Sequence, residues 1–195
     1  MTLRKRVPFW LLFSLPAILL AFGFLRGATP PQEMLHPSGA MAIRMMVAAM
    51  LPGPLIEYLG PNRFLSGWIT LRRNFGVIAF IYALLHLIFY VADTGTLDAQ
   101  LGELPRPAIW TGWLSLVLMV IPAAISFDAA VRALGRRWKR LQQVSYGALL
   151  FSIVHWVLLE WHWMSAMVHL MPLLVAWTMR AVARSRWRRL RSASA

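Results

Sequence analysis

The stretch Arg136–Glu160, RRWKRLQQVSYGALLFSIVHWVLLE, decides the fold of this chain. It opens with a cluster of positive charge, continues with about twenty mostly apolar residues and no proline, and carries His155 near its far end. An α-helix rises about 1.5 Å per residue, so this run matches the roughly 30 Å hydrocarbon core of a bilayer. The stretch therefore predicts a membrane helix with a buried imidazole. An ionisable side chain is costly at that depth, so we expect His155 to face the protein interior and to serve a function there.

The composition points to the same class of protein along the whole chain. Of the 195 residues, 59% are hydrophobic, and they occur in blocks separated by short charged or Pro/Gly-rich segments. This pattern predicts an all-α, single-domain, polytopic membrane protein. The net charge is +13, but the basic residues lie at predicted helix ends, so we expect a topological role and no nucleic-acid partner. The chain has no cysteine, which excludes disulfides, thiolate-ligated iron and a covalently attached c-type haem.

The apolar blocks predict a bundle of six transmembrane helices. Ser38 follows Pro37 and is a candidate N-cap for the second helix. A single helix through the last two blocks would be about twice as long as the bilayer is thick, so we expect a turn near 160–165. The predicted helices cover about residues 8–25, 38–58, 74–92, 108–127, 139–160 and 165–179.

Lysine and arginine residues predict the orientation of these helices. Three precede the first helix, three lie between the second and third, five between the fourth and fifth, and six follow from Arg180 onward. The other connections are mainly acidic. Because positive charge is retained on the cytoplasmic side, we expect both termini in the cytoplasm.

Two histidines are then expected at one level of the membrane. His86 lies about six residues from the outer end of its helix and His155 about five, so both should lie roughly 8 Å inside the outer boundary. Two neutral imidazoles at equal depth on different helices can supply both axial ligands of a b-type haem. The alternative for either histidine alone is a hydrogen bond between helices.

Two further side chains lie near this level. His169, on the last helix, is either structural or an alternative haem ligand. Arg44 lies in the outer half of the second helix. A guanidinium pairs well with a haem propionate, but it can also extend to the outer surface, and both interpretations are open.

Four segments together resemble the MsrQ family, the haem-binding membrane subunit of the periplasmic methionine-sulfoxide reductase system, within the ferric-reductase-like transmembrane group. They are SGAMAIRMMVAAMLPGPL (38–55), LRRNFGVIAFIYALLHLIFY (71–90), RPAIWTGWLSLVLMVIPAAIS (106–126) and LGRRWKRLQQVSYGALLFSIVHW (134–156).

The resemblance implies a b-type cytochrome of the bacterial inner membrane. It would pass electrons from the quinone pool, or from a cytoplasmic flavin reductase through FMN, to a periplasmic molybdopterin-dependent subunit that repairs oxidised methionine. Substrate reduction would occur on that partner. His86 and His155 fall on the family's haem-ligand positions.

One position departs from the family pattern. The family usually carries another histidine thirteen residues before the His155 position, and this chain has Gln142 there, in WKRLQQVSY. We therefore expect one haem in the outer half of the membrane, not two. An electron donor, quinol or flavin, would bind toward the inner surface near Arg73, Gln142, Gln143 and Tyr146.

Three functions other than that of the MsrQ family are open on the sequence alone. The chain could be another ferric-reductase-like electron carrier, a small transporter or channel with proton-relay histidines, or a structural subunit without a cofactor. Few carboxylates lie within the spans and no inverted repeat is visible, which disfavours a transporter.

Overall fold

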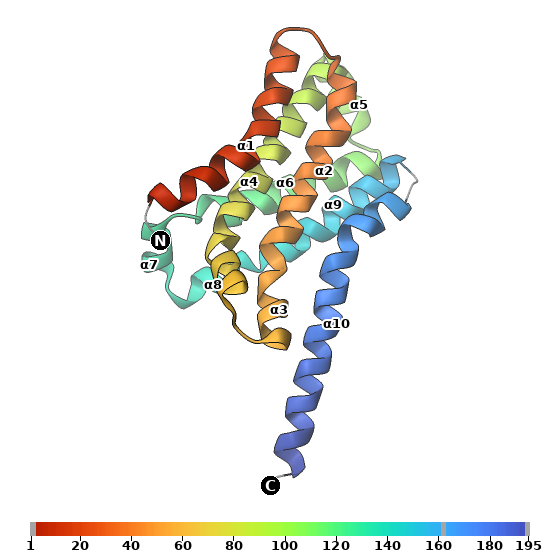
Figure 1. The fold of residues 1–195 in the computed structure, drawn as a ribbon. Helices are drawn as coiled ribbons and strands as arrows, with labels where there is room; N and C mark the ends of the chain where they lie inside the picture. The colour runs from red at the N-terminus through yellow and green to blue at the C-terminus, as the bar shows by residue number, and fades with distance from the viewer. Residues whose placement is uncertain (1–2, 161–162, 194–195) are drawn as a thin grey trace.

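The computed structural model describes residues 3–160 and 163–193, with side chains described for 7–159 and 163–186. Within these ranges the chain forms helices and no strand, as predicted (Figure 1). Trp161 and His162, in the predicted turn between the last two membrane helices, lie outside the described residues. The helices are α1 (Leu3–Leu25), α2 (Pro31–Met50), α3 (Pro52–Leu59), α4 (Arg63–Thr94), α5 (Leu97–Glu103), α6 (Pro107–Ala124), α7 (Asp128–Leu134), α8 (Arg136–Gln142), α9 (Val144–Glu160) and α10 (Trp163–Ala193).

Six helical segments in the described part are long and apolar enough to cross a membrane, which confirms the predicted membrane fold. The orientation of the termini stays a prediction. The six segments are Val7–Leu25, Pro31–Leu59, Arg63–Thr94, Pro107–Ala124, Arg136–Leu159 and Trp163–Arg186.

The second membrane helix begins earlier than the sequence suggests. It was expected from Ser38, but α2 begins at Pro31, a residue type that suits the first helical position because its missing N–H needs no partner there. Pro37 lies inside α2. The N-cap prediction for Ser38 is therefore wrong: its hydroxyl donates to the carbonyl of Met34 at 2.7 Å within the helix. Pro52 begins the short continuation α3.

Two other helices are longer than predicted. The third membrane helix begins at Arg63 and not near residue 74, because the side chain of Asn62 caps it by accepting from the backbone N–H of Leu65 at 2.8 Å. The last extends past Met179, and Figure 1 shows its C-terminal end projecting beyond the other helices. By contrast, α6 ends at Ala124, and the separate short helices α7 and α8 lead into α9.

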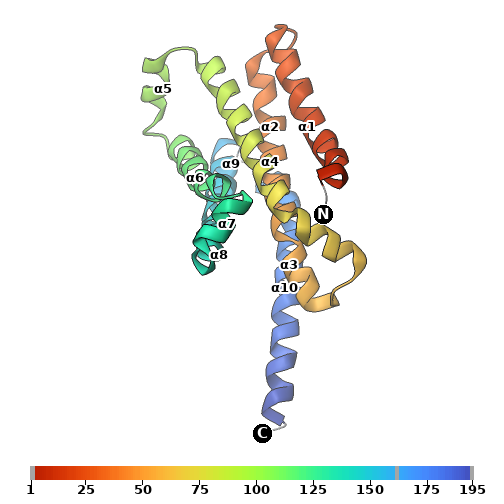
Figure 2. The ribbon, with the colours of Figure 1, turned by 90° about the vertical axis from the view of Figure 1, so that its left-hand side faces the viewer.

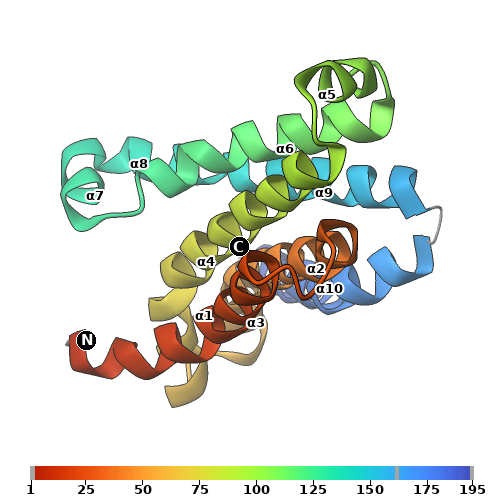
Figure 3. The same ribbon diagram turned by 90° about the horizontal axis from the view of Figure 1, so that it is seen from above.

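Four of the membrane helices form two antiparallel pairs. Helix α2 packs most closely on α4, and α6 on α9, while the two pairs meet mainly through α4 and α6. Figure 3 shows the α6–α9 pair crossing the direction of α2 at a large angle, and Figure 2 shows the two pairs side by side. Helix α10 packs on α3 and α2, and α1 packs on α4 through the contact of Phe9 with Phe75. This arrangement makes the C-terminal halves of α4 and α9 face each other across the space between the two pairs.

Candidate functional site

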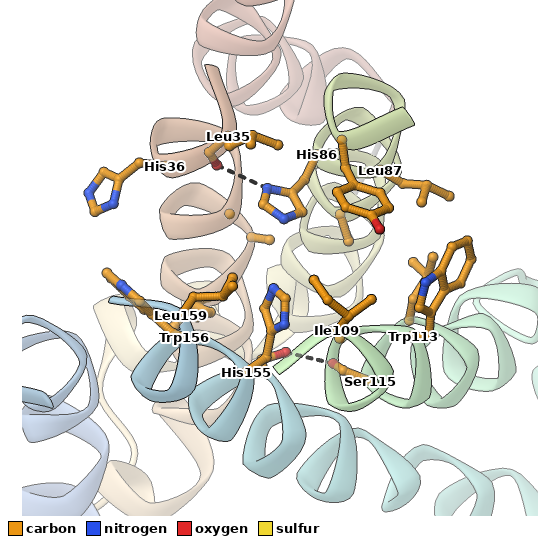
Figure 4. Close-up of a pocket in the computed structure, with 18 of the residues that line it drawn as sticks. Leu35, His36, His86, Leu87, Ile109, Trp113, Ser115, His155, Trp156 and Leu159 are labelled. Carbon is orange, nitrogen blue, oxygen red and sulfur yellow. Dashed lines mark hydrogen bonds between the residues drawn. The ribbon is translucent and has the colours of Figure 1, made fainter. Parts of the chain in front are cut away.

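A cavity of about 670 Å³ lies between the two helix pairs. Residues from α2, α4, α6 and α9 line it, and its wall is mainly apolar, with Trp113 and Trp156 among the large side chains (Figure 4). A volume of this size, with a few polar groups converging on it, is typical of a site for a small molecule or cofactor.

Two histidines face one another across this cavity. His86 comes from α4 and His155 from α9, and Figure 4 shows their rings pointing toward each other. The ring centroids are 6.1 Å apart and the ring planes are nearly perpendicular, at 89°. Helices from different pairs therefore contribute one imidazole each to the same cavity.

Backbone carbonyls fix the protonation of both rings. Nδ1 of His86 lies 2.9 Å from the carbonyl oxygen of Leu35, and Nδ1 of His155 lies 2.5 Å from that of Ala108. A carbonyl only accepts, so each Nδ1 carries the proton and donates. In a neutral imidazole this leaves a lone pair on Nε2, the arrangement found in metal-ligating histidines whose other nitrogen donates to a backbone carbonyl.

Each ring also lies against a glycine on the neighbouring helix. An added Cβ at Gly39 of α2 would lie 3.2 Å from Nδ1 of His86. At Gly112 of α6, a Cβ would lie only 2.7 Å from Nδ1 and from Cε1 of His155. The absence of a side chain at these two positions creates the space that each imidazole occupies.

The two surroundings are equivalent in chemistry and in spacing. The carbonyl that binds the ring lies four residues before the glycine, and a hydroxyl side chain directly precedes the glycine in both helices. The hydroxyl of Ser38 shares its proton between the carbonyls of Met34 (2.7 Å) and Leu35 (3.0 Å), and that of Thr111 shares its proton between the carbonyls of Pro107 (2.8 Å) and Ala108 (2.9 Å). Both hydroxyls are buried. We call these sets the α2 cradle (Leu35, Ser38, Gly39) and the α6 cradle (Ala108, Thr111, Gly112).

The two imidazoles suit a metal ion whose remaining ligands come from a cofactor. A metal ion held between the two imidazoles by bonds of about 2.0 Å would need a separation of the ring centroids of about 6 Å. The observed separation is 6.1 Å. No group of three or more His, Cys, Asp or Glu side chains that could hold a bare metal ion occurs in the described ranges. Two opposed imidazoles in a large apolar cavity are therefore suited to the iron of a porphyrin.

One end of the cavity is polar. The hydroxyl of Tyr90 donates to Glu103 at 3.0 Å, and Arg106 forms an ion pair with the other oxygen of Glu103 at 3.0 Å. Both Glu103 and Arg106 line the cavity. This end therefore offers a guanidinium to an acidic group on a bound molecule.

Arg44 and His169 are not among the residues that line this cavity. Nε of Arg44 donates to Nε2 of His169 at 2.9 Å, and Nδ1 of His169 donates to the carbonyl of Ser165 at 2.8 Å. Both ring nitrogens of His169 are thus engaged. The geometry is at odds with a propionate contact for Arg44 and with iron ligation by His169, because the two residues bind each other beside the cavity.

The predicted donor site near the inner end is only partly assembled. Arg73 and Gln142 line a second cavity of about 60 Å³, where Arg73 forms an ion pair with Asp128 and Gln142 donates to the carbonyl of Pro122 at 3.1 Å. Gln143 and Tyr146 do not line it. The ring of Tyr146 instead lies beside Trp177 at a centroid distance of 6.1 Å.

The two cradles and Arg106 were not predicted from the sequence. A signal for the cradles was present as the dipeptides Ser38-Gly39 and Thr111-Gly112, each within a predicted membrane helix. Small residues at such positions allow close approach of a neighbouring helix.

Comparison with known protein families identifies the class of membrane protein to which this chain belongs. A family model described as "Ferric reductase like transmembrane component" matches residues 38–153, which include His86 and both glycines. The chain is therefore a ferric-reductase-like transmembrane protein.

Individual relatives define the family more narrowly. The chain is 32% identical over 196 aligned residues to a protein of Rhizobium meliloti, covering 92% of this chain and 87% of the relative. It is 33% identical to a Brucella ovis protein (83% and 78% covered) and 30% identical to a Brucella anthropi protein (79% and 72% covered). All three relatives are named "Protein-methionine-sulfoxide reductase heme-binding subunit MsrQ". This chain belongs to the MsrQ family.

Proposed function

We propose that this chain is a b-type cytochrome that carries electrons through the bacterial inner membrane to the catalytic subunit of a methionine-sulfoxide reductase. The observation that carries the proposal is the pair of opposed imidazoles, each with Nδ1 bound to a carbonyl and Nε2 directed to the cavity. The family's name supports the cofactor and the reductase.

His86 and His155 would be the axial ligands of the haem iron, which supplies reversible one-electron chemistry when bound. The chain's own residues orient the two imidazoles and hold the Nδ1 protons through the carbonyls of the two cradles. The apolar wall excludes water from the site. Arg106, which lines the polar end, takes the propionate role that the sequence suggested for Arg44.

A single haem is the expected content. The cavity near Gln142 has a volume of about 60 Å³, against about 670 Å³ for the cavity between the histidines, and is far too small for a porphyrin. The amide of Gln142 is also engaged with the carbonyl of Pro122.

With both termini in the cytoplasm, the haem cavity lies near the periplasmic face. Electrons would then leave toward a periplasmic molybdopterin-dependent subunit, on which methionine sulfoxide is reduced. The donor is a quinol of the membrane or a flavin reductase.

The visible spectrum of the detergent-purified protein, expressed with ample haem, tests this proposal. We expect a Soret band with sharp α and β bands after reduction, lost in His86→Ala and in His155→Ala. His169→Ala is the matched control and should keep the spectrum, because His169 lies outside the cavity. A colourless wild-type protein would refute the proposal.

A further inference from the structure

Arg44 and His169 form a polar pair on the membrane-facing surface. Arg44 is exposed and lies thirteen residues after Pro31 and fifteen before Leu59 in its span, so about 20 Å of helix lies on either side. An arginine in the middle of a membrane span is costly and is retained for a function by default.

The partners of this guanidinium are neutral. Nε donates to His169, whose Nδ1 proton is bound to the carbonyl of Ser165, so the imidazole is the neutral tautomer. Nη1 donates weakly to the sulfur of Met41 at 3.6 Å. A guanidinium has five N–H donors, so several remain for a ligand with acceptor oxygens.

Aromatic contacts connect this pair to the large cavity. The ring of His169 lies 5.0 Å from that of Trp156, centroid to centroid. Trp156 follows His155 in sequence and lines the cavity. A redox-active ring bound at His169 would therefore be separated from the cavity by one indole.

We propose that Arg44 and His169 bind the head group of a lipid-soluble quinol, the electron donor. This inference rests on the proposed function. The N–H groups on Nη1 and Nη2 of Arg44 donate to one ring oxygen of the quinol. A quinol hydroxyl displaces Nε of Arg44 from Nε2 of His169, and Nε2 then accepts from that hydroxyl. Oxidation of one quinol to quinone releases two electrons and two protons. The single ferric haem would accept these electrons one at a time, the first being passed to the catalytic subunit before the second arrives. One proton would pass first to His169, and both protons would leave to water at the nearer membrane surface.

Two other sites or ligands fit less well. A phospholipid phosphate lies at the edge of the hydrocarbon core, about 15 Å from its centre, whereas Arg44 is directed sideways to His169 near mid-span. The cavity near Arg73 and Gln142 is too small for a quinone ring at about 60 Å³. A quinol carries its head group within the lipid and reaches an exposed pair directly.

Stopped-flow reduction of the haem by decylubiquinol tests the proposal, with the holoprotein in phosphatidylcholine nanodiscs. Arg44→Gln and His169→Gln should each slow reduction by about tenfold, the effect of losing one hydrogen bond of about 1.4 kcal/mol. Their spectra and their reduction by dithionite should match wild type, which shows that the haem site is intact. Arg26→Gln, an arginine stacked on Phe22 outside the pair, is the charge-matched control and should reduce at the wild-type rate.

Three outcomes would overturn the inference. They are wild-type rates in both variants, slowing only in Gln142→Ala, or an Arg44→Gln effect that appears only when anionic phosphatidylglycerol is added, which would assign the pair to a lipid phosphate. Retention of oxidised decylubiquinone in excess of that by empty phosphatidylcholine nanodiscs, measured by extraction, needs no haem and should fall about tenfold in Arg44→Gln. A protein that binds quinone but no haem would contradict the proposed function alone, and equal retention would contradict the quinol site alone.

Discussion

Replacing Gly112 by alanine should displace one imidazole and weaken haem binding. The new Cβ would lie 2.7 Å from both Cε1 and Nδ1 of His155 and 3.2 Å from its Cγ. Real Cβ atoms essentially never approach other heavy atoms this closely. The ring must therefore move away from α6, and its Nδ1 bond to the carbonyl of Ala108 will lengthen or break.

The magnitude follows from the close packing of α6 on α9. Inserting a methyl group into a well-packed interior costs about 1–3 kcal/mol, and losing an outer hydrogen bond of a metal ligand costs about 10–100-fold in affinity. We expect Gly112→Ala to lower haem affinity at least tenfold. Gly39→Ala should have a smaller effect, since its nearest ring atom lies at 3.2 Å and a shift of a few tenths of an ångström relieves the contact.

Haem titration of the apoprotein, followed at the Soret band, measures both affinities. Gly76→Ala is the matched control on α4, because a Cβ there meets no atom within 4 Å and the change to alanine favours a helix by up to about 1 kcal/mol. Wild-type affinity in Gly112→Ala, or an equal loss in Gly76→Ala, would refute the steric argument.

Three other predictions concern side chains around the cavity and the last helix. Arg106→Gln should keep the haem spectrum but weaken haem binding by about tenfold, the worth of one charged hydrogen bond, and titration of the apoprotein would reveal it. Ser38→Ala and Thr111→Val should each lower stability by about 1 kcal/mol in thermal unfolding, and by similar amounts because the two cradles are equivalent; unequal losses would argue against that equivalence. Glu57→Gln removes the exposed ion pairs with α10 and should change stability by less than about 1 kcal/mol, with an unchanged spectrum.

The level of the two histidines was accessible from the sequence because helix rise converts residue number directly into depth. The sequence alone did not show in which direction a side chain on these helices points. Gly39 and Arg44 are five residues apart, so they lie about 140° apart around α2 at 3.6 residues per turn. If Gly39 faces the imidazole of His86, Arg44 cannot face the same cavity, and only packing shows which of the two does.

The inner-end donor site stays a prediction, and only two of its four residues, Arg73 and Gln142, line one small cavity. Helix α8 ends at Gln142 and α9 begins at Val144, so Gln143 lies at the junction of two separate helices. A single predicted helix through this region placed Gln142, Gln143 and Tyr146 on one continuous axis, which the break between α8 and α9 interrupts. Helix α2 begins before the predicted start at Ser38, because it continues through Pro37, a residue type that usually marks a helix boundary.

The two imidazoles belong to different helix pairs that touch each other over a limited area. A porphyrin bound by both histidines would stabilise the contact between the two helix pairs, since any ligand that binds only the folded state adds its binding free energy to stability. Without the porphyrin, the two helix pairs would separate more readily and expose apolar surface to membrane proteases. The amount of this protein in the membrane would therefore depend on the supply of porphyrin.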